Sequence, residues 1–172
     1  MLWLWAFIGG LIGTIFMDFT VSLLTRAGIS SGLEGLLGRW VLGFPRGQFI
    51  IDGHQERLTP STELEKLVGK WFHFIVGGGV VALGYPLWFA ITGQVLPGSP
   101  LFGGIVYGIA TLSIAWFIQY PPFGFGVCGS NAPEGSQPIL ATVPMHLAYG
   151  LGLGLVLQFA PQSTVYFLNT FL

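Results

Sequence analysis

Three ionisable side chains lie inside long apolar stretches of this sequence. Asp18 interrupts the run that begins at Leu2, His73 stands in KWFHFIVGGGVVALGY, and His146 stands in MHLAYGLGLGLVLQF. An ionisable group in hydrocarbon costs about 2.5 to 3.5 kcal/mol on insertion scales, so each of the three is a candidate for a functional site. Two imidazoles and a carboxylate have the chemistry to ligate a divalent metal or to pass a proton.

Two other interpretations of the same residues stay open. The carboxylate of Asp18 can accept a hydrogen bond from one histidine and so hold the helices in register, with no ligand involved. Alternatively, the two histidines can ligate one haem, because Gly77 and Gly150, four residues after each histidine, leave room for a flat ring. The hypotheses are therefore a structural contact, a ligand site with a divalent metal or a haem as cofactor, or a proton relay.

The composition excludes an ordinary soluble domain. Of the 172 residues, 52% are hydrophobic and only 8% are charged, and the mean hydropathy is +0.73, whereas a soluble domain carries about 25% charged residues. The net charge of −1 indicates no nucleic-acid partner, and the single Cys128 allows no intramolecular disulfide. Motifs of soluble catalysis are absent, which argues against a conventional enzyme but does not exclude an intramembrane one.

Four apolar windows of about 20 residues predict four transmembrane helices in one integral membrane domain, residues 1–172. The windows cover residues 2–25, 71–91, 101–120 and 139–161. We therefore expect an all-α protein, a bundle of four transmembrane helices. The tail that follows the last window is too short to cross and is predicted to lie at the interface.

The first loop is predicted to hold a short helix of its own. Ser31 and Glu34 have the spacing of a capping box, and the apolar residues that follow recur on one helical face. An amphipathic interfacial helix is expected at about residues 31–43. A second capping box, Thr62 with Glu65, is expected to begin the helix that becomes the second span.

The charges predict an orientation. All six Lys and Arg residues lie between residues 26 and 70, so the first loop is expected on the cytoplasmic side and both termini on the outer side. At 1.5 Å per residue, the polar residues of the four spans then lie in the cytoplasmic leaflet. These residues are Asp18, His73, Gln119 and His146.

Small residues recur at steps of three or four on one face of every span, the same face that carries its polar residue. Such faces let transmembrane helices approach closely, so the polar side chains are expected to point into the bundle. The four faces are Gly10, Thr14, Asp18, Ser22 and Thr25; Gly69, His73, Gly77 and Gly84, with Val80 or Val81 between the last two; Gly104, Gly108, Thr111, Ala115 and Gln119; and Thr142, His146, Gly150 and Gly154.

The loops hold a second set of candidates. Basic residues there can bind lipid headgroup phosphate or can simply follow the positive-inside rule. One of them, Arg46, is placed between a proline and a glycine, and we expect it to reach Glu134 and lock the two cytoplasmic loops over the histidines. The loop candidates are Arg39, Arg46, Arg57, Asn131 and Glu134.

Four segments resemble a bacterial family of small four-helix inner-membrane proteins that is catalogued as a domain of unknown function. They are GRWVLGFPRGQF (38–49), HFIVGGGVVALGY (73–85), QYPPFGFGVCGSNAPEG (119–135) and HLAYGLGL (146–153). The resemblance covers residues 10–160 and implies the four-helix fold and a bacterial inner-membrane location, but no activity. Tyr120-Pro121-Pro122 departs from the simpler Gln-Pro-Gly turn of the family pattern, which affects the expected shape of the third loop.

These observations lead to two hypotheses about function. The first is an accessory or structural subunit that packs against lipid and against other membrane subunits, because almost no soluble mass extends from the bundle. The second is a stand-alone binding, transport or catalytic unit at Asp18, His73 and His146, which would use a divalent metal, a proton relay or a bis-histidine haem.

Overall fold

Residues 1–33 and 35–160 are described by a computed structural model, and this part of the chain is helical with no strand. Four helical stretches are long and apolar enough to cross a membrane, as predicted: Leu2–Arg26, Glu63–Thr92, Pro100–Phe123 and Pro138–Gln158. The second stretch begins eight residues before the predicted window. Glu34, the end of the fourth window at Pro161 and the tail beyond it lie outside the described residues.

Two of the four stretches are interrupted by π-helix, which the sequence analysis did not foresee. The first and last stretches are single helices, α1 (Leu2–Arg26) and α7 (Pro138–Gln158). The second consists of α4 (Glu63–Phe72), the π-helix η2 (His73–Val80) and α5 (Gly84–Thr92). The third consists of α6 (Pro100–Ala110), the π-helix η3 (Ile114–Gln119) and the short 3₁₀ helix η4 (Pro121–Phe123).

Local signals explain where the long helices begin. The predicted capping box at α4 is confirmed, since Thr62 Oγ1 accepts from the Glu65 amide at 3.2 Å and the Glu65 carboxylate accepts from the Thr62 amide at 2.7 Å. Ser99 caps α6 by accepting from the Phe102 amide at 3.3 Å. Both α6 and α7 carry a proline in their first turn, where the missing amide proton is not needed.

The helix in the first loop is shorter than predicted. It is α2 (Leu36–Gly43), followed by the 3₁₀ helix η1 (Phe44–Arg46) and the single turn α3 (Gly53–Glu56). The expected start at residue 31 is wrong because Gly32 and Gly35 adopt left-handed backbone, with φ of 81° and 80°, which a right-handed helix cannot contain. Ser31 instead accepts a hydrogen bond from the Leu33 amide.

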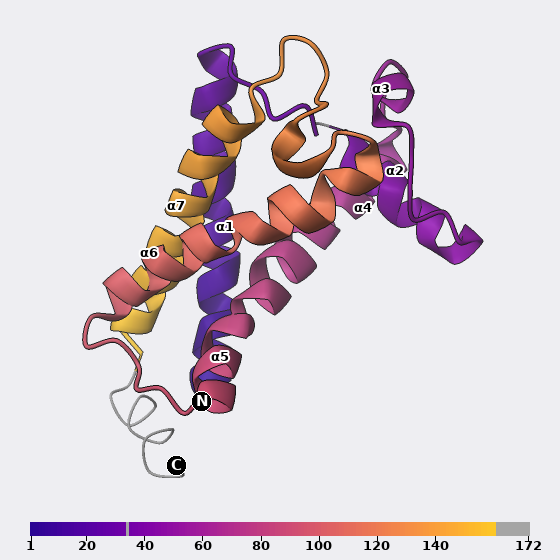
Figure 1. Cartoon of the computed structure of the whole chain (residues 1–172). Helices are drawn as coiled ribbons and strands as arrows, with labels where there is room; N and C mark the ends of the chain where they lie inside the picture. The colour runs from indigo at the N-terminus through magenta and orange to yellow at the C-terminus, as the bar shows by residue number, and fades with distance from the viewer. Residues whose placement is uncertain (34, 161–172) are drawn as a thin grey trace.

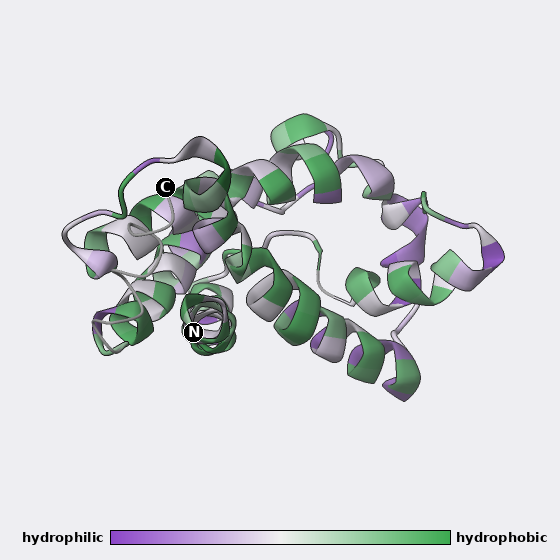
Figure 2. Cartoon of the chain, turned by 90° about the horizontal axis from the view of Figure 1, so that it is seen from below, coloured by the Kyte–Doolittle hydropathy of each residue, from purple (hydrophilic) through white to green (hydrophobic). Residues whose placement is uncertain are grey.

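The connections gather at the two ends of the molecule. Figure 1 shows the start of α1 and the end of α7 at one end of the bundle, and α2, α3 and the segment after η4 at the other. Hydrophobic residues dominate the long helices, while hydrophilic residues gather around α2, α3 and the start of α4 (Figure 2). Both features agree with the expected grouping of the first and third loops on one side.

Glycines set the helix contacts, as the small-residue faces predicted. α7 packs along both α1 and α6. A Cβ on Gly104 would collide with the Gly154 backbone, and one on Gly108 with the backbones of His146 and Gly150. In the second span, the glycine that meets α1 is Gly78 and not the predicted Gly77, because a Cβ there would collide with Thr14 Oγ1 and with the Gly10 carbonyl.

One hydrogen bond ties α7 to η2 and gives a testable contribution. The buried hydroxyl of Tyr149 donates to the Gly78 carbonyl at 2.8 Å. Tyr149→Phe should lower the free energy of unfolding by about 1 kcal/mol, the usual net worth of such a bond. Equilibrium unfolding in detergent micelles measures the change. Tyr85→Phe is the matched control, because the buried Tyr85 hydroxyl has no hydrogen-bond partner among the described residues; equal losses in the two variants would contradict the prediction.

The first and third loops are locked together, but not by the predicted contact. Arg46 donates to its neighbour Gln48 at 3.3 Å, and among the described residues no ion pair joins it to Glu134. The lock is an apolar cluster of Leu36, Tyr120, Phe123 and Phe125, against which Leu33, Trp40, Ile51, Trp116 and Ala132 pack. Two backbone bonds accompany it, from Ile51 to Pro122 at 2.9 Å and from Gln137 to Ser30 at 2.7 Å. Burial of aromatic side chains contributes more to stability than an exposed ion pair does.

Candidate functional site

A cavity of about 580 Å³ lies among the helices at the end that carries the first and third loops. All four membrane-compatible stretches line it, through Asp18, His73, Gln119 and His146, together with Leu33, Leu37 and Trp40 of the first loop. Most of its wall is apolar. Its volume lies within the range of about 300 to 1,000 Å³ that is typical of small-molecule sites.

Both π-helices form parts of the cavity wall. η2 contributes His73, Val76 and Gly77, and η3 contributes Ile114, Ala115, Ile118 and Gln119. A π-helix is less stable than an α-helix of the same length and is frequent at functional sites. Two π-helices in the wall of one cavity therefore indicate a functional site, and this indication is independent of the polar residues.

Asp18 and His73 form a contact between α1 and the second span, one of the two histidine pairings that the sequence left open. His73 Nε2 donates to Asp18 Oδ1 at 3.1 Å, and the two side chains are 30% and 47% exposed respectively. The pair therefore lies at the mouth of the cavity. A Cβ on Gly77 would meet only His73 Nδ1 at 3.6 Å and the Phe72 carbonyl at 4.0 Å, so Gly77 leaves room beside the imidazole.

His146 does not join this pair. Its Nδ1 lies 2.8 Å from the hydroxyl of Thr111, the residue that follows α6, and the Thr111 side chain is buried. Thr142, one turn before His146 on α7, accepts from Trp116 Nε1 at 3.0 Å. The two histidines thus line one cavity at different depths and have different partners.

The metal and haem hypotheses meet a geometric obstacle. Among residues 1–33 and 35–160, no three His, Cys, Asp or Glu side chains are grouped closely enough to hold a metal ion, so Asp18, His73 and His146 do not form a three-ligand site. A bis-histidine haem needs one nitrogen of each ring on the iron. Nε2 of His73 is already bonded to Asp18, so ligation of an iron through that nitrogen would break the Asp18–His73 contact.

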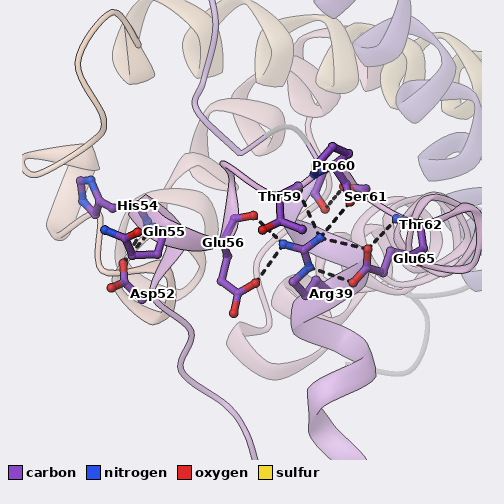
Figure 3. Close-up of polar contacts among 11 residues, drawn as sticks. Arg39, Asp52, His54, Gln55, Glu56, Thr59, Pro60, Ser61, Thr62 and Glu65 are labelled. Atoms are coloured by element: carbon purple, nitrogen blue, oxygen red, sulfur yellow. Dashed lines mark hydrogen bonds and ion pairs between the residues drawn. The ribbon is translucent and has the colours of Figure 1, made fainter.

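The first loop is held over the cavity by Arg39 on α2 (Figure 3). Its guanidinium donates from Nε and Nη2 to the two Glu65 oxygens at 2.8 and 3.1 Å, and from Nη1 to Glu56 Oε2 at 2.9 Å. It also donates to the carbonyl oxygens of Glu56, Thr59 and Pro60. The Glu65 carboxylate raises the pKa of Arg39 above its ordinary value, so the side chain stays charged.

This arrangement argues against headgroup binding, one of the two alternatives for the loop arginines, in the case of Arg39. The Arg39 side chain is only 14% exposed, and its donors are engaged within the protein. Close backbone packing supports the same contact, since a Cβ on Gly38 would collide with the Glu65 carbonyl of α4. The Arg39–Glu65 ion pair and this backbone packing together hold α2 against α4 beside the cavity.

The other loop candidates lie away from the cavity wall. Arg57 and Glu134 are exposed and have no ion-pair partner among the described residues. Asn131 donates to the Gly124 carbonyl at 2.8 Å and lies 3.5 Å from His54 Nε2. These three side chains therefore share no site with Asp18 and His73.

Sequence reasoning missed the Arg39 clasp, the π-helices and the contribution of the first loop to the cavity. The capping box identified Glu65, but only as a residue of a helix start. The second partner of the Glu65 carboxylate, Arg39, lies 26 residues earlier in the sequence. The run Gly77-Gly78-Gly79 was the one available sign of an irregular helix.

Comparison with known families supports the resemblance drawn from the four segments. No curated protein and no solved structure matches the chain. The family model described as "Protein of unknown function (DUF2938)" matches residues 7–158. The match runs from within α1 to the end of α7 and includes every residue of the cavity wall, so the chain belongs to the DUF2938 family.

Proposed function

We propose that this protein binds an amphiphilic small molecule within the membrane, in the cavity between its four long helices. The observation that carries the proposal is the cavity itself: about 580 Å³, mostly apolar, with the Asp18–His73 pair at its mouth. Ligand sites typically combine an apolar wall with a few placed polar groups. An apolar tail suits the apolar part of the wall, and a polar head suits the few polar side chains on it.

The stand-alone hypothesis covers binding, transport and catalysis. The side chains of the cavity best support binding, which is also the first step of transport or catalysis. The Asp18–His73 contact also suits proton exchange, because the carboxylate orients one imidazole nitrogen and leaves the other without a hydrogen-bond partner among the described residues. A role in chemistry would need a reacting group on the ligand.

Filling the cavity tests the proposal. Gly77→Leu should extend a side chain into the cavity without moving a helix, because a Cβ there meets no atom closer than 3.6 Å. Retention of the bound amphiphile should fall about tenfold or more, the equivalent of 1 to 3 kcal/mol of overpacking. Extraction and mass spectrometry of small molecules that copurify with the protein, compared with the bulk membrane lipid, measure this loss.

The matched control is Gly98→Leu. Gly98 lies in the connection between α5 and α6, where a Cβ also meets nothing within 4 Å, and it is not part of the cavity wall. The control should retain the native set of bound molecules. If the native protein carries only bulk lipid, and Gly77→Leu leaves that set unchanged, the binding function is wrong.

The accessory-subunit hypothesis stays a prediction beside this one. Exposed apolar side chains on the long helices, such as Phe19, Trp88 and Phe102, suit lipid as well as a partner helix. Mild solubilisation followed by size analysis tests it: a stable larger complex supports a subunit role, and a lone chain argues against it. We further propose a bacterial inner-membrane location with the Arg39 loop on the cytoplasmic side, which reporter fusions at the two termini and in the loops would test.

A further inference from the structure

We propose that the ligand of this cavity carries a hydrogen-bond donor, an O–H or an N–H, on its head group. This inference rests on the proposed binding function and concerns the class of ligand. It follows from the hydrogen bonds of the inner wall, where Thr111, Thr142, His146 and Tyr149 line the cavity. Each of these donors is already engaged within the protein, while lone pairs remain.

The proton on His146 is placed by its neighbour. The Thr111 hydroxyl lies 2.6 Å from the Gly108 carbonyl, and because a carbonyl cannot donate, the single hydroxyl proton goes to Gly108. Thr111 Oγ1 therefore accepts from His146 Nδ1–H across the 2.8 Å contact. The ring also makes a hydrogen bond to the Gly108 carbonyl, which can only accept and therefore uses the same N–H. In the neutral imidazole this leaves Nε2 as an acceptor.

The other inner hydroxyls follow the same pattern. Thr142 Oγ1 donates to the Pro138 carbonyl at 2.8 Å and accepts from Trp116 Nε1. The Tyr149 hydroxyl donates to the Gly78 carbonyl at 2.8 Å. In each case the proton points at the backbone, so the side of the oxygen that remains can only accept.

Donors that remain available lie toward the mouth. Lys70 is exposed and Gln119 is half-buried on the cavity wall, and neither has a hydrogen-bond partner among the described residues. Here His73 donates to Asp18 and keeps Nδ1 as a further acceptor. A carboxylate or carbonyl head would thus find donors only at the mouth and would meet lone pairs further in. A hydroxyl or amine head can satisfy His146 Nε2 instead, and unmatched polar groups in such a site weaken binding.

Matched probes in lipid nanodiscs test this inference. The O–H arm compares 4-octylphenol with 4-octylanisole, which differ by one methyl in place of the proton; the N–H arm compares 4-octylaniline with its N,N-dimethyl form. We expect the donor of each pair to bind about tenfold more tightly, the worth of one hydrogen bond. Ligand depletion against empty nanodiscs measures affinity, and the histidine ¹⁵N resonances report the tautomer of His146.

His146→Asn is the specific variant. Asparagine places an amide N–H where histidine places Nδ1–H, so the bond to Thr111 can persist while the Nε2 acceptor is lost. The variant should have the same unfolding temperature as the native protein, and it should bind 4-octylphenol no more tightly than 4-octylanisole. In the native protein, the probe pair with the larger ratio of affinities identifies the head group: an O–H if it is the phenol pair, and an N–H if it is the aniline pair.

The outcomes separate this inference from the binding function. Equal affinity for both members of each pair, abolished by Gly77→Leu, would overturn the donor requirement and leave the binding function intact. Tighter binding of 4-octylbenzoate than of the phenol, or a His146 proton on Nε2, would also overturn it. If no probe binds above empty nanodiscs, this inference fails, and the copurification measurement then decides the binding function separately.

Discussion

Gly108→Leu is expected to leave no stably folded protein, whereas Gly98→Leu should fold normally. Gly108 lies where α6 crosses α7, and a Cβ there would come within van der Waals overlap of the His146 carbonyl and of the Gly150 Cα at 2.6 Å. These atoms are backbone, so they cannot rotate away, and the two helices must separate. Overpacking costs about 1 to 3 kcal/mol even where side chains can adjust, and here we expect about 3 kcal/mol or more.

The graded series Gly108→Ala, Val and Leu makes the prediction sharper. Membrane helices associate through close packing and not through the exclusion of water, so each added methyl should lower the unfolding temperature and the yield of monodisperse protein. Thermal unfolding in detergent measures both. The same series at Gly98 should be flat. If the Gly108 series were also flat, the close crossing of α6 and α7 at Gly108 would be wrong.

Arg39→Gln is expected to cost about 2 to 3 kcal/mol of stability and to release the first loop. The substitution removes the bidentate contact with Glu65 and the contact with Glu56, and it leaves the 14% exposed Glu65 carboxylate without its cation. Hydrogen bonds to charged groups are worth about 1.5 to 3 kcal/mol, and the partial exposure of Glu56 keeps the loss below that of a fully buried ion pair. Unfolding in detergent and limited proteolysis between residues 44 and 62 measure the effect.

Two variants make this result specific. Arg57→Gln removes the same charge from an exposed side chain and should change stability by less than about 0.5 kcal/mol. Arg39→Lys should recover only part of the loss, because an ammonium cannot pair with both oxygens of Glu65. In a double-mutant cycle with Glu65→Gln, a coupling energy near zero would show that the contact contributes nothing.

Loss of the clasp should also affect the cavity. Leu33, Leu37 and Trp40 form part of its wall, and α2 is held by Arg39 and by the contact of Gly38 with α4. The Arg39 side chain itself is not part of that wall. A binding defect in Arg39→Gln would therefore come from a change in the position of the first loop. The defect in Gly77→Leu, by contrast, comes from a side chain that fills the cavity.

The sequence by itself determined the all-helical class, the four membrane-compatible stretches and the small-residue faces. These depend on composition and on a period of three to four residues, which are properties of each segment alone. It also placed Asp18, His73, Gln119 and His146 toward the interior, and all four line one cavity. The Asp18–His73 contact was among the pairings it left open.

Only the tertiary structure decided which histidine pairs with which residue. His146 bonds to Thr111, 35 positions away, and Arg39 bonds to Glu65 rather than to lipid, because these partners depend on how helices pack against each other. The π-helix at His73–Val80 has a wider turn than an α-helix. It therefore turns Gly78 toward α1 and leaves Gly77 on the cavity wall, a difference of one residue that a regular helical period cannot predict.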